Sequence, residues 1–188
     1  MRTTAVALFC FLAATFLVPA SSQAGVEITK VPDVQCGSLR PAACLKKVFG
    51  NCDEPCVLPA SDGGWSSDWA LIEKAVKRKV RIRFVIDDRC DSFCALFAEW
   101  MRHDMPDRIC IAPGASLGYH RVADVELIHG QWVIQQRYSV QHNDATEKWL
   151  KEHGGETDEP KRIPYADLVA MGIWPTCKPS DPKVVAHQ

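Results

Sequence analysis

The stretch Arg81–Arg121, RIRFVIDDRCDSFCALFAEWMRHDMPDRICIAPGASLGYHR, decides the fold. Its first residues alternate between polar and apolar side chains, which predicts a strand that ends at Asp87-Asp88. Apolar residues then recur at helical spacing from Phe93 to about Asp104, and Pro106 stops the helix. Two short apolar runs follow, at residues 108–112 and 117–122, and predict two more strands.

Similar patterns continue on both sides of this stretch. Before it we expect a short helix, a short strand and an amphipathic helix, at residues 42–48, 56–58 and 67–78. After it we expect a hairpin of residues 125–128 and 132–137, for which a helix over 132–141 is the weaker alternative. A helix that Asn143 or Asp144 caps then reaches His153, and a last helix covers 165–171. Strand–helix units that repeat in this way predict one α/β layered domain over residues 56–188, preceded by a cysteine-rich lead-in over 25–55.

The first residues have the composition of a secretory signal. Arg2 supplies a positive start, the run Ala5–Pro19 is apolar, and the small residues Ser22–Ala24 suit cleavage. The alternative is an uncleaved membrane anchor, but the run is shorter than the ~20 residues that a spanning helix needs. We therefore expect residues 1–24 to be removed and the mature protein to be exported, periplasmic or secreted, without a membrane partner.

The charge of the chain argues against a nucleic-acid partner. The formal net charge is −1, so no general affinity for polyanions is implied. The one short basic cluster, Lys77–Lys79, falls at the end of a predicted helix.

Cysteines are the second strong signal. Of the nine cysteines Cys10 lies in the signal segment, and the even number that remains predicts disulfides in an exported protein. A metal site built from the two C-x3-C pairs is the alternative, but the spacing is longer than in zinc knuckles and no histidine pair accompanies it. We expect no metal. The disulfide candidates, whose pairing the sequence leaves open, are Cys36, Cys44, Cys52, Cys56, Cys90, Cys94, Cys110 and Cys177.

Three features form a candidate site for nucleophilic catalysis. Ser92 precedes the predicted helix at Phe93, where unpaired N–H groups and the positive end of the helix dipole lie. His120 sits in a later predicted strand, from which it can approach the serine as a base. The pair Gly63-Gly64 precedes another predicted helix and lets the backbone come close to a ligand. Taken alone, each feature is common in structural roles: an N-cap, a packed histidine and a turn.

Together, the motifs resemble the Clp protease proteolytic-subunit and crotonase-like superfamily, especially its exported bacterial members. The matching text is Ser61-Asp62-Gly63-Gly64-Trp65, Cys90-Asp91-Ser92-Phe93-Cys94, Ala112–His120 with its G-x-H ending, and the closing segment Tyr165–Trp174. The resemblance covers about residues 56–175 and implies a layered Clp/crotonase-like α/β fold.

The resemblance also implies roles for individual residues. Ser92 is then the nucleophile, His120 the base, and Asp158 the nearest match to the family's third catalytic residue. Backbone amides of Gly63, Gly64 and Phe93 are the implied oxyanion-hole donors. The implied activity is that of a serine hydrolase, peptidase-like, on a peptide or small acyl substrate, without a cofactor. Self-association into a homo-oligomer is common in the family and stays open here.

Two alternatives remain. Asp91 and Phe93 flank Ser92 where the family has small residues, which favours a catalytically inactive binding or assembly module of the same fold. A carboxylate beside the nucleophile disfavours a developing oxyanion, and Phe93 can crowd the oxyanion hole. The other alternative is a small disulfide-rich secreted protein in which the order of serine and histidine is accidental.

Overall fold

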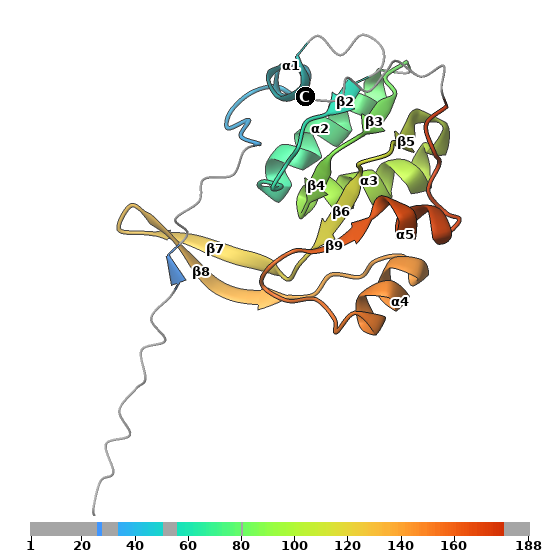
Figure 1. The fold of residues 1–188 in the computed structure, drawn as a ribbon. Coiled ribbons are helices and arrows are strands. Elements are labelled where there is room, and N and C mark those ends of the chain that lie inside the picture. The colour runs from blue at the N-terminus through green and yellow to red at the C-terminus, as the bar shows by residue number, and fades with distance from the viewer. Residues whose placement is uncertain (1–25, 28–33, 51–55, 80, 179–188) are drawn as a thin grey trace, which may run out of the picture.

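The computed structural model describes residues 26–27, 34–50, 56–79 and 81–178 (Figure 1). The expected signal segment, residues 1–24, and Cys52 lie outside the described residues. Within the described residues the fold is mixed α/β, as predicted, with helices packed around small sheets and a long hairpin that extends away from them (Figure 1).

The helices begin and end close to where the sequence predicts. The helix predicted over 93–104 is confirmed at both ends, and Asn143 caps the following helix by accepting hydrogen bonds from the N–H groups of Ala145 and Thr146. The α-helices in the described residues are α1 (Pro41–Phe49), α2 (Ser66–Arg78), α3 (Phe93–Asp104), α4 (Asp144–Glu152) and α5 (Tyr165–Ala170). A 3-10 turn, Pro106–Arg108, follows α3.

The described strands form small sheets of three. In one, β2 (Cys56–Leu58), β3 (Phe84–Ile86) and β5 (Ile109–Ile111) are parallel. In the next, β4 (Arg89–Asp91) is parallel to β6 (Ser116–Tyr119), which pairs antiparallel with β9 (Lys161–Pro164). The third contains the hairpin of β7 (Val122–Ile128) and β8 (Gln131–Tyr138), with β1 (Val26–Glu27) against β8.

Three strands differ from the sequence prediction. The chain does not turn directly from Asp87-Asp88 to Ser92, because β4 intervenes; its residues Arg-Cys-Asp lack the apolar alternation of a half-buried strand. Strand β9 was likewise not predicted, and it forms because β6 offers it an edge. Strand β6 ends at Tyr119, so His120 lies just past the strand rather than within it.

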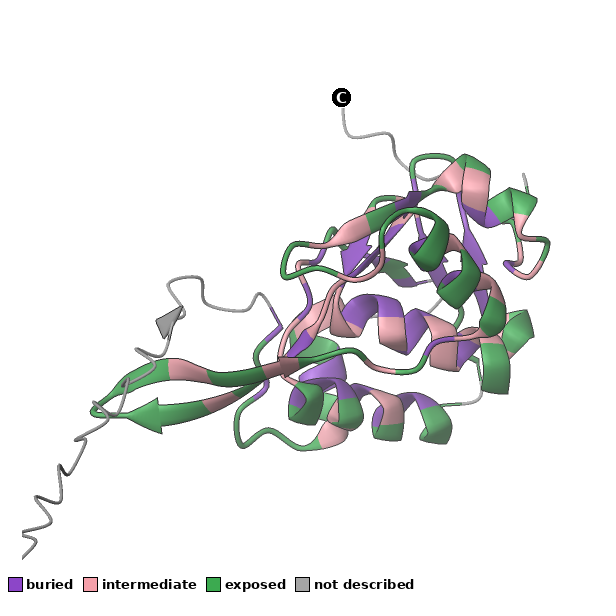
Figure 2. Ribbon diagram, turned by 90° about the horizontal axis from the view of Figure 1, so that it is seen from below, coloured by how far each residue is buried: buried purple, intermediate pink, exposed green. Residues whose placement is uncertain are grey.

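One main apolar core holds the helices to the sheets. The inward faces of α2 and α3 are buried, and Phe97 of α3 makes ring contacts with Phe84 of β3 and Trp69 of α2. Buried residues gather in the strands and on one side of these helices, whereas the outer part of the β7–β8 hairpin is largely exposed (Figure 2). No helix in the described residues is long and apolar enough to cross a membrane.

The parallel pairing of β4 and β6 positions the candidate site. Asp91, the last residue of β4, is in register with Gly118 of β6. Ser92 and His120 therefore leave the carboxyl ends of two adjacent strands, which is where open α/β sheets bind ligands.

Candidate functional site

Ser92 occupies a sharp turn between β4 and α3. Its φ of 59° and ψ of −129° lie in a region that residues with a Cβ rarely adopt. The side chain does not cap α3, although serine at this position usually does. A strained serine between a strand and a helix, with its hydroxyl free of a capping bond, is the arrangement of a nucleophile elbow.

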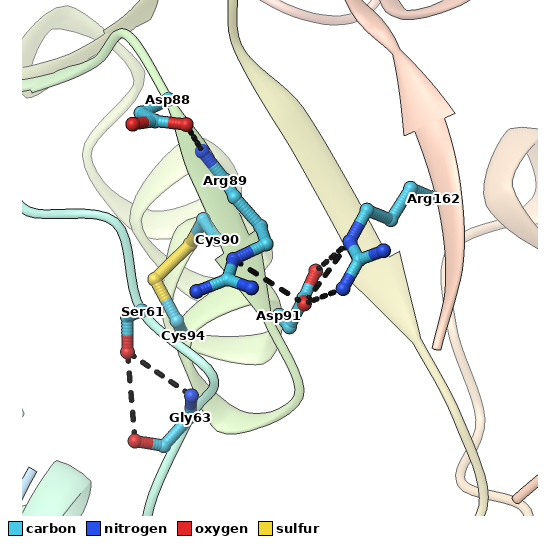
Figure 3. The surroundings of a disulfide bond; sticks show 8 residues. All are labelled: Ser61, Gly63, Asp88, Arg89, Cys90, Asp91, Cys94 and Arg162. Atoms are coloured by element: carbon cyan, nitrogen blue, oxygen red, sulfur yellow. Dashed lines mark hydrogen bonds and ion pairs between the residues drawn. A yellow bond between two sulfur atoms is a disulfide. The ribbon is translucent and has the colours of Figure 1, made fainter. Parts of the chain in front are cut away.

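Covalent and hydrogen bonds hold this turn. Residues 90–94 are named the serine turn here, and Cys90 at its start is disulfide-bonded to Cys94 in α3 (Figure 3). The N–H of Ser92 donates to the carbonyl of Gly118 at 2.7 Å, and its carbonyl accepts from the N–H of Leu96 at 3.1 Å. Strain of this kind persists only where its surroundings over-determine it, as they do here.

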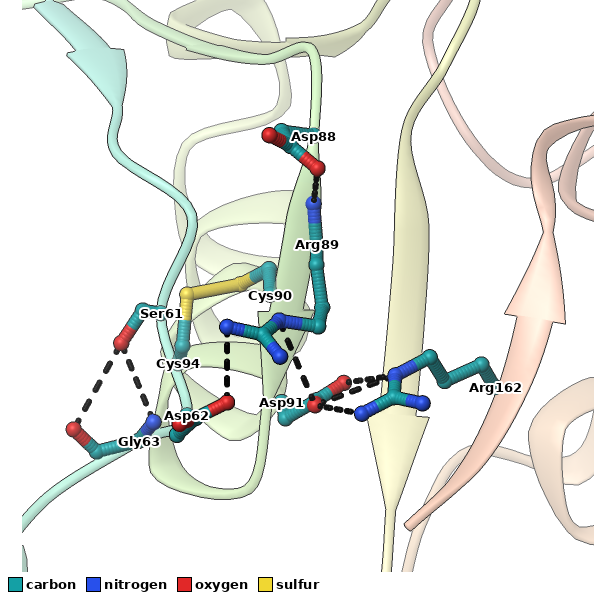
Figure 4. A network of polar contacts seen from close by, with 9 residues as sticks. All are labelled: Ser61, Asp62, Gly63, Asp88, Arg89, Cys90, Asp91, Cys94 and Arg162. Carbon is teal, nitrogen blue, oxygen red and sulfur yellow. Dashed lines mark hydrogen bonds and ion pairs between the residues drawn. A yellow bond between two sulfur atoms is a disulfide. The ribbon is translucent and has the colours of Figure 1, made fainter.

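The carboxylate of Asp91, next to Ser92, is paired with arginines. The guanidinium of Arg162 in β9 donates to both carboxylate oxygens, at 2.7 and 3.1 Å, and that bonding raises the pKa of Arg162 (Figure 4). Arg89 lies 3.8 Å from the same carboxylate and 2.8 Å from Asp62. A Cβ at Gly118 would come within 1.9 Å of Asp91, so this packing requires glycine there. The ion pairs offset the charge that the sequence placed beside Ser92.

His120 has one ring nitrogen fixed by the backbone. Its Nδ1 lies 2.8 Å from the carbonyl oxygen of Arg121, and a carbonyl only accepts hydrogen bonds. Nδ1 therefore carries the hydrogen, and Nε2 of the neutral ring keeps its lone pair, as a general base requires. The imidazole is half-buried, and within the described part of the chain it makes no hydrogen bond with Ser92.

Asp158 does not contact the histidine. Its carboxylate accepts hydrogen bonds from the guanidinium of Arg121 at 2.6 and 3.0 Å and lies 3.6 Å from Arg137. The N–H of Arg121 also donates to the carbonyl of Thr157. The structure thus brings Asp158 to Arg121, whose carbonyl binds His120, and not to the imidazole where the resemblance implied it.

The implied oxyanion donors differ in their present bonding. Gly63, whose φ is 100°, packs directly on Ser92: a Cβ at this glycine would lie 3.0 Å from the serine Oγ. Its N–H, however, donates to Ser61 Oγ at 3.0 Å. Gly64 forms an isolated parallel bridge with Val34. Phe93 is the first residue of α3, so its N–H has no acceptor within the helix. Its half-buried ring packs against the main core.

A buried polar cluster behind the site was missed in the sequence. His142, 7% exposed, lies 2.7 Å from Glu156 through Nε2 and 3.6 Å from Glu99 through Nδ1. Burial lowers the pKa of His142, but its contacts with the two glutamates outweigh burial and raise it. Tyr119 donates to Glu99, and burial raises the pKa of that phenol well above its ordinary value. No spacing in the sequence marks this cluster, because distant segments contribute it.

The disulfides agree with the sequence prediction. Cys36 bonds to Cys44, Cys90 to Cys94, and Cys110 to Cys177, and Cys56 is also disulfide-bonded. These bridges fit an exported protein. In the part of the chain that the structure describes, no group of three or more histidines, cysteines or acidic residues is placed to hold a metal ion.

Comparison with known proteins adds no assignment: no protein-family model matches the chain, and no curated protein matches it.

Proposed function

We propose that the protein is an exported serine hydrolase with a Clp/crotonase-like arrangement, which transfers acyl groups through Ser92. The observation that carries the proposal is the backbone of Ser92. A strained serine that does not cap its helix and lies at the carboxyl end of a strand has the geometry of a nucleophile elbow, and strain of this kind clusters at active sites.

In the proposed reaction His120 is the base. Its Nε2 takes the proton of Ser92 Oγ as the oxygen attacks the substrate carbonyl, and later returns that proton to the leaving group. The carbonyl of Arg121, rather than a carboxylate, orients the ring through Nδ1–H. The N–H of Phe93 supports the developing oxyanion, and Gly63 joins it once its N–H leaves Ser61. Catalytic hydrogen bonds are often long before substrate binds, and the proposal requires Nε2 of His120 to reach Ser92 Oγ in the substrate complex.

Peptides are the proposed substrates, because the motifs around Gly63, Ser92 and His120 resemble those of the Clp-type peptidases. The test is hydrolysis of activated acyl esters and of a peptide library by the mature protein. Ser92→Ala should abolish turnover and His120→Gln should lower kcat by about 100-fold or more. An exposed serine that follows β8, Ser139, supplies the control: Ser139→Ala should keep full activity.

A second candidate is a non-catalytic binding or assembly module of the same fold. The bond between the Gly63 N–H and Ser61 Oγ favours it, because an occupied donor weakens an oxyanion hole. Under this candidate Ser92→Ala and wild-type protein show the same background hydrolysis while both stay folded.

A further inference from the structure

Apart from the serine turn, the structure has a pocket that is suited to a ligand. A pocket of about 340 Å³ opens between the start of α2 and strand β8. The tryptophan pocket, as it is named here, is lined mainly by Gln35, Trp65, Ser66, Ser67, Asp68 and Trp132. Its volume suits one side chain or a small group rather than a large cofactor.

Two indole rings form its wall. The ring centroids of Trp65 and Trp132 are 5.0 Å apart, with their planes tilted by 42°. Trp132 is 43% exposed although tryptophan usually buries its ring, and it belongs to β8 of the hairpin that extends from the body (Figure 1). Exposed indole faces attract cations through their ring quadrupole.

A buried carboxylate completes the pocket. Asp68 lines it and is 4% exposed, yet among the described residues none donates a hydrogen bond to its carboxylate or pairs with it as an ion. Because Asp68 lines the pocket, a cation that enters it can pair with this carboxylate. The start of α2 contributes about half a positive charge, which leaves the pocket negative overall. Its lining contains no lysine or arginine.

We propose that the tryptophan pocket binds the cationic side chain of a lysine or arginine residue in a peptide. The ammonium or guanidinium group pairs with Asp68, and the methylene stem packs on Trp65 and Trp132. An apolar side chain would leave Asp68 buried and unpaired, so the pocket selects against it.

The pocket adjoins the glycine turn that packs on the proposed nucleophile. Trp65 directly follows Gly63-Gly64, and Gly63 packs on Ser92. A peptide whose basic side chain fills the pocket would therefore run past this glycine turn toward Ser92. That role as a specificity subsite rests on the proposed hydrolase function, whereas binding of the cation does not.

The test measures binding to the mature protein by calorimetry, with Nα-acetyl-arginine methylamide and Nα-acetyl-lysine methylamide as probes. Nα-acetyl-norleucine methylamide is the neutral match. We expect the cationic probes to bind at least about tenfold more tightly than norleucine, and Asp68→Asn to remove that preference. Trp132→Ala, on the exposed hairpin, should weaken the cationic probes by about fivefold or more.

Matched controls guard against general effects. Asp144→Asn, in the first turn of α4, removes an exposed aspartate, and Ile128→Ala removes an exposed apolar side chain from the same hairpin, opposite Gln131 rather than Trp132. Both should bind the probes like wild type. The proposal is overturned if norleucine binds equally well, if neither cation binds, or if folded Trp132→Ala keeps full affinity.

The same probes separate this proposal from the hydrolase proposal. Folded Ser92→Ala protein should bind them unchanged. If the protein binds the cationic probes but hydrolyses no substrate, only the hydrolase proposal is contradicted. If it hydrolyses substrates but shows no preference for the cationic probes, only the proposal for the tryptophan pocket is contradicted.

Discussion

The carboxylate of Asp91 and the guanidinium of Arg162 form a two-oxygen ion pair, with Nη2–Oδ2 at 2.7 Å and both Nε–O distances at 3.1 Å. The carboxylate is 1% exposed and the arginine side chain 44%. The pair joins β4 to β9 across β6, immediately before Ser92. It therefore ties the serine turn to the last strand of the sheet.

Arg162→Ala should destabilise the protein by about 2 kcal/mol, because it leaves the Asp91 carboxylate buried with only the more distant Arg89 nearby. The loss is smaller than for a fully buried pair, since Arg162 is partly solvated. Urea unfolding measures it. Arg81→Ala, at an exposed arginine, is the control and should change stability by less than about 0.5 kcal/mol. Equal effects of the two substitutions would contradict the role of the pair.

Ser92→Gly should be more stable than Ser92→Ala by about 1 kcal/mol. Glycine adopts the positive φ without strain, a relief that exceeds its entropic cost, whereas alanine keeps the Cβ and the strain. Ser67 on α2 gives the opposite sign, because glycine in an ordinary helix is less stable than alanine. Thermal unfolding of the four variants checks both signs. A less stable Ser92→Gly would show that the turn is unstrained.

Removal of the Cys90–Cys94 disulfide and removal of the Cys110–Cys177 disulfide should affect stability and activity in opposite order. Their sequence separations are 4 and 67 residues, so loop entropy predicts losses of about 2 and about 4 kcal/mol when each pair is replaced by alanine. The smaller loss should nevertheless reduce hydrolysis more, since only that bridge holds the serine turn. If the Cys90 and Cys94 double variant keeps wild-type turnover, the bridge does not position Ser92.

His142 should make stability depend on pH. Its pKa in the folded protein lies above the ordinary 6.5, so its contribution is complete below about pH 6.5 and is lost as pH rises through the raised value. Urea unfolding at about pH 6 and about pH 9 should show this loss in wild type and a smaller one in His142→Gln. The exposed His153 provides the control: His153→Gln should keep the wild-type difference. If wild type and His142→Gln lose the same stability between these two pH values, a protonated His142 does not stabilise the fold through Glu99 and Glu156.

The sequence predicted those helices whose ends are determined by residues a few positions away. Helix α3 was predicted at both ends because Pro106 and the apolar spacing after Phe93 act within a few residues. Disulfides were expected, but the sequence left open that Cys90 bonds to Cys94, since that depends on the geometry of the serine turn.

The rest of the site depends on contacts between distant segments. Arg162 meets Asp91, and Asp158 meets Arg121, only because β9 and the segment before it return to β6. The resemblance implied that Asp158 lies near His120, but the guanidinium of Arg121 binds its carboxylate instead. His142 carried no motif, so its buried cluster became visible only in three dimensions.

The most direct test is covalent labelling of the folded mature protein at about pH 7.5 with a fluorophosphonate, followed by peptide mass spectrometry. The hydrolase proposal predicts a phosphonyl adduct on Ser92 in wild-type protein, strongly reduced in His120→Gln and absent from Ser92→Ala. Folded wild-type protein that carries no adduct at Ser92 would contradict it.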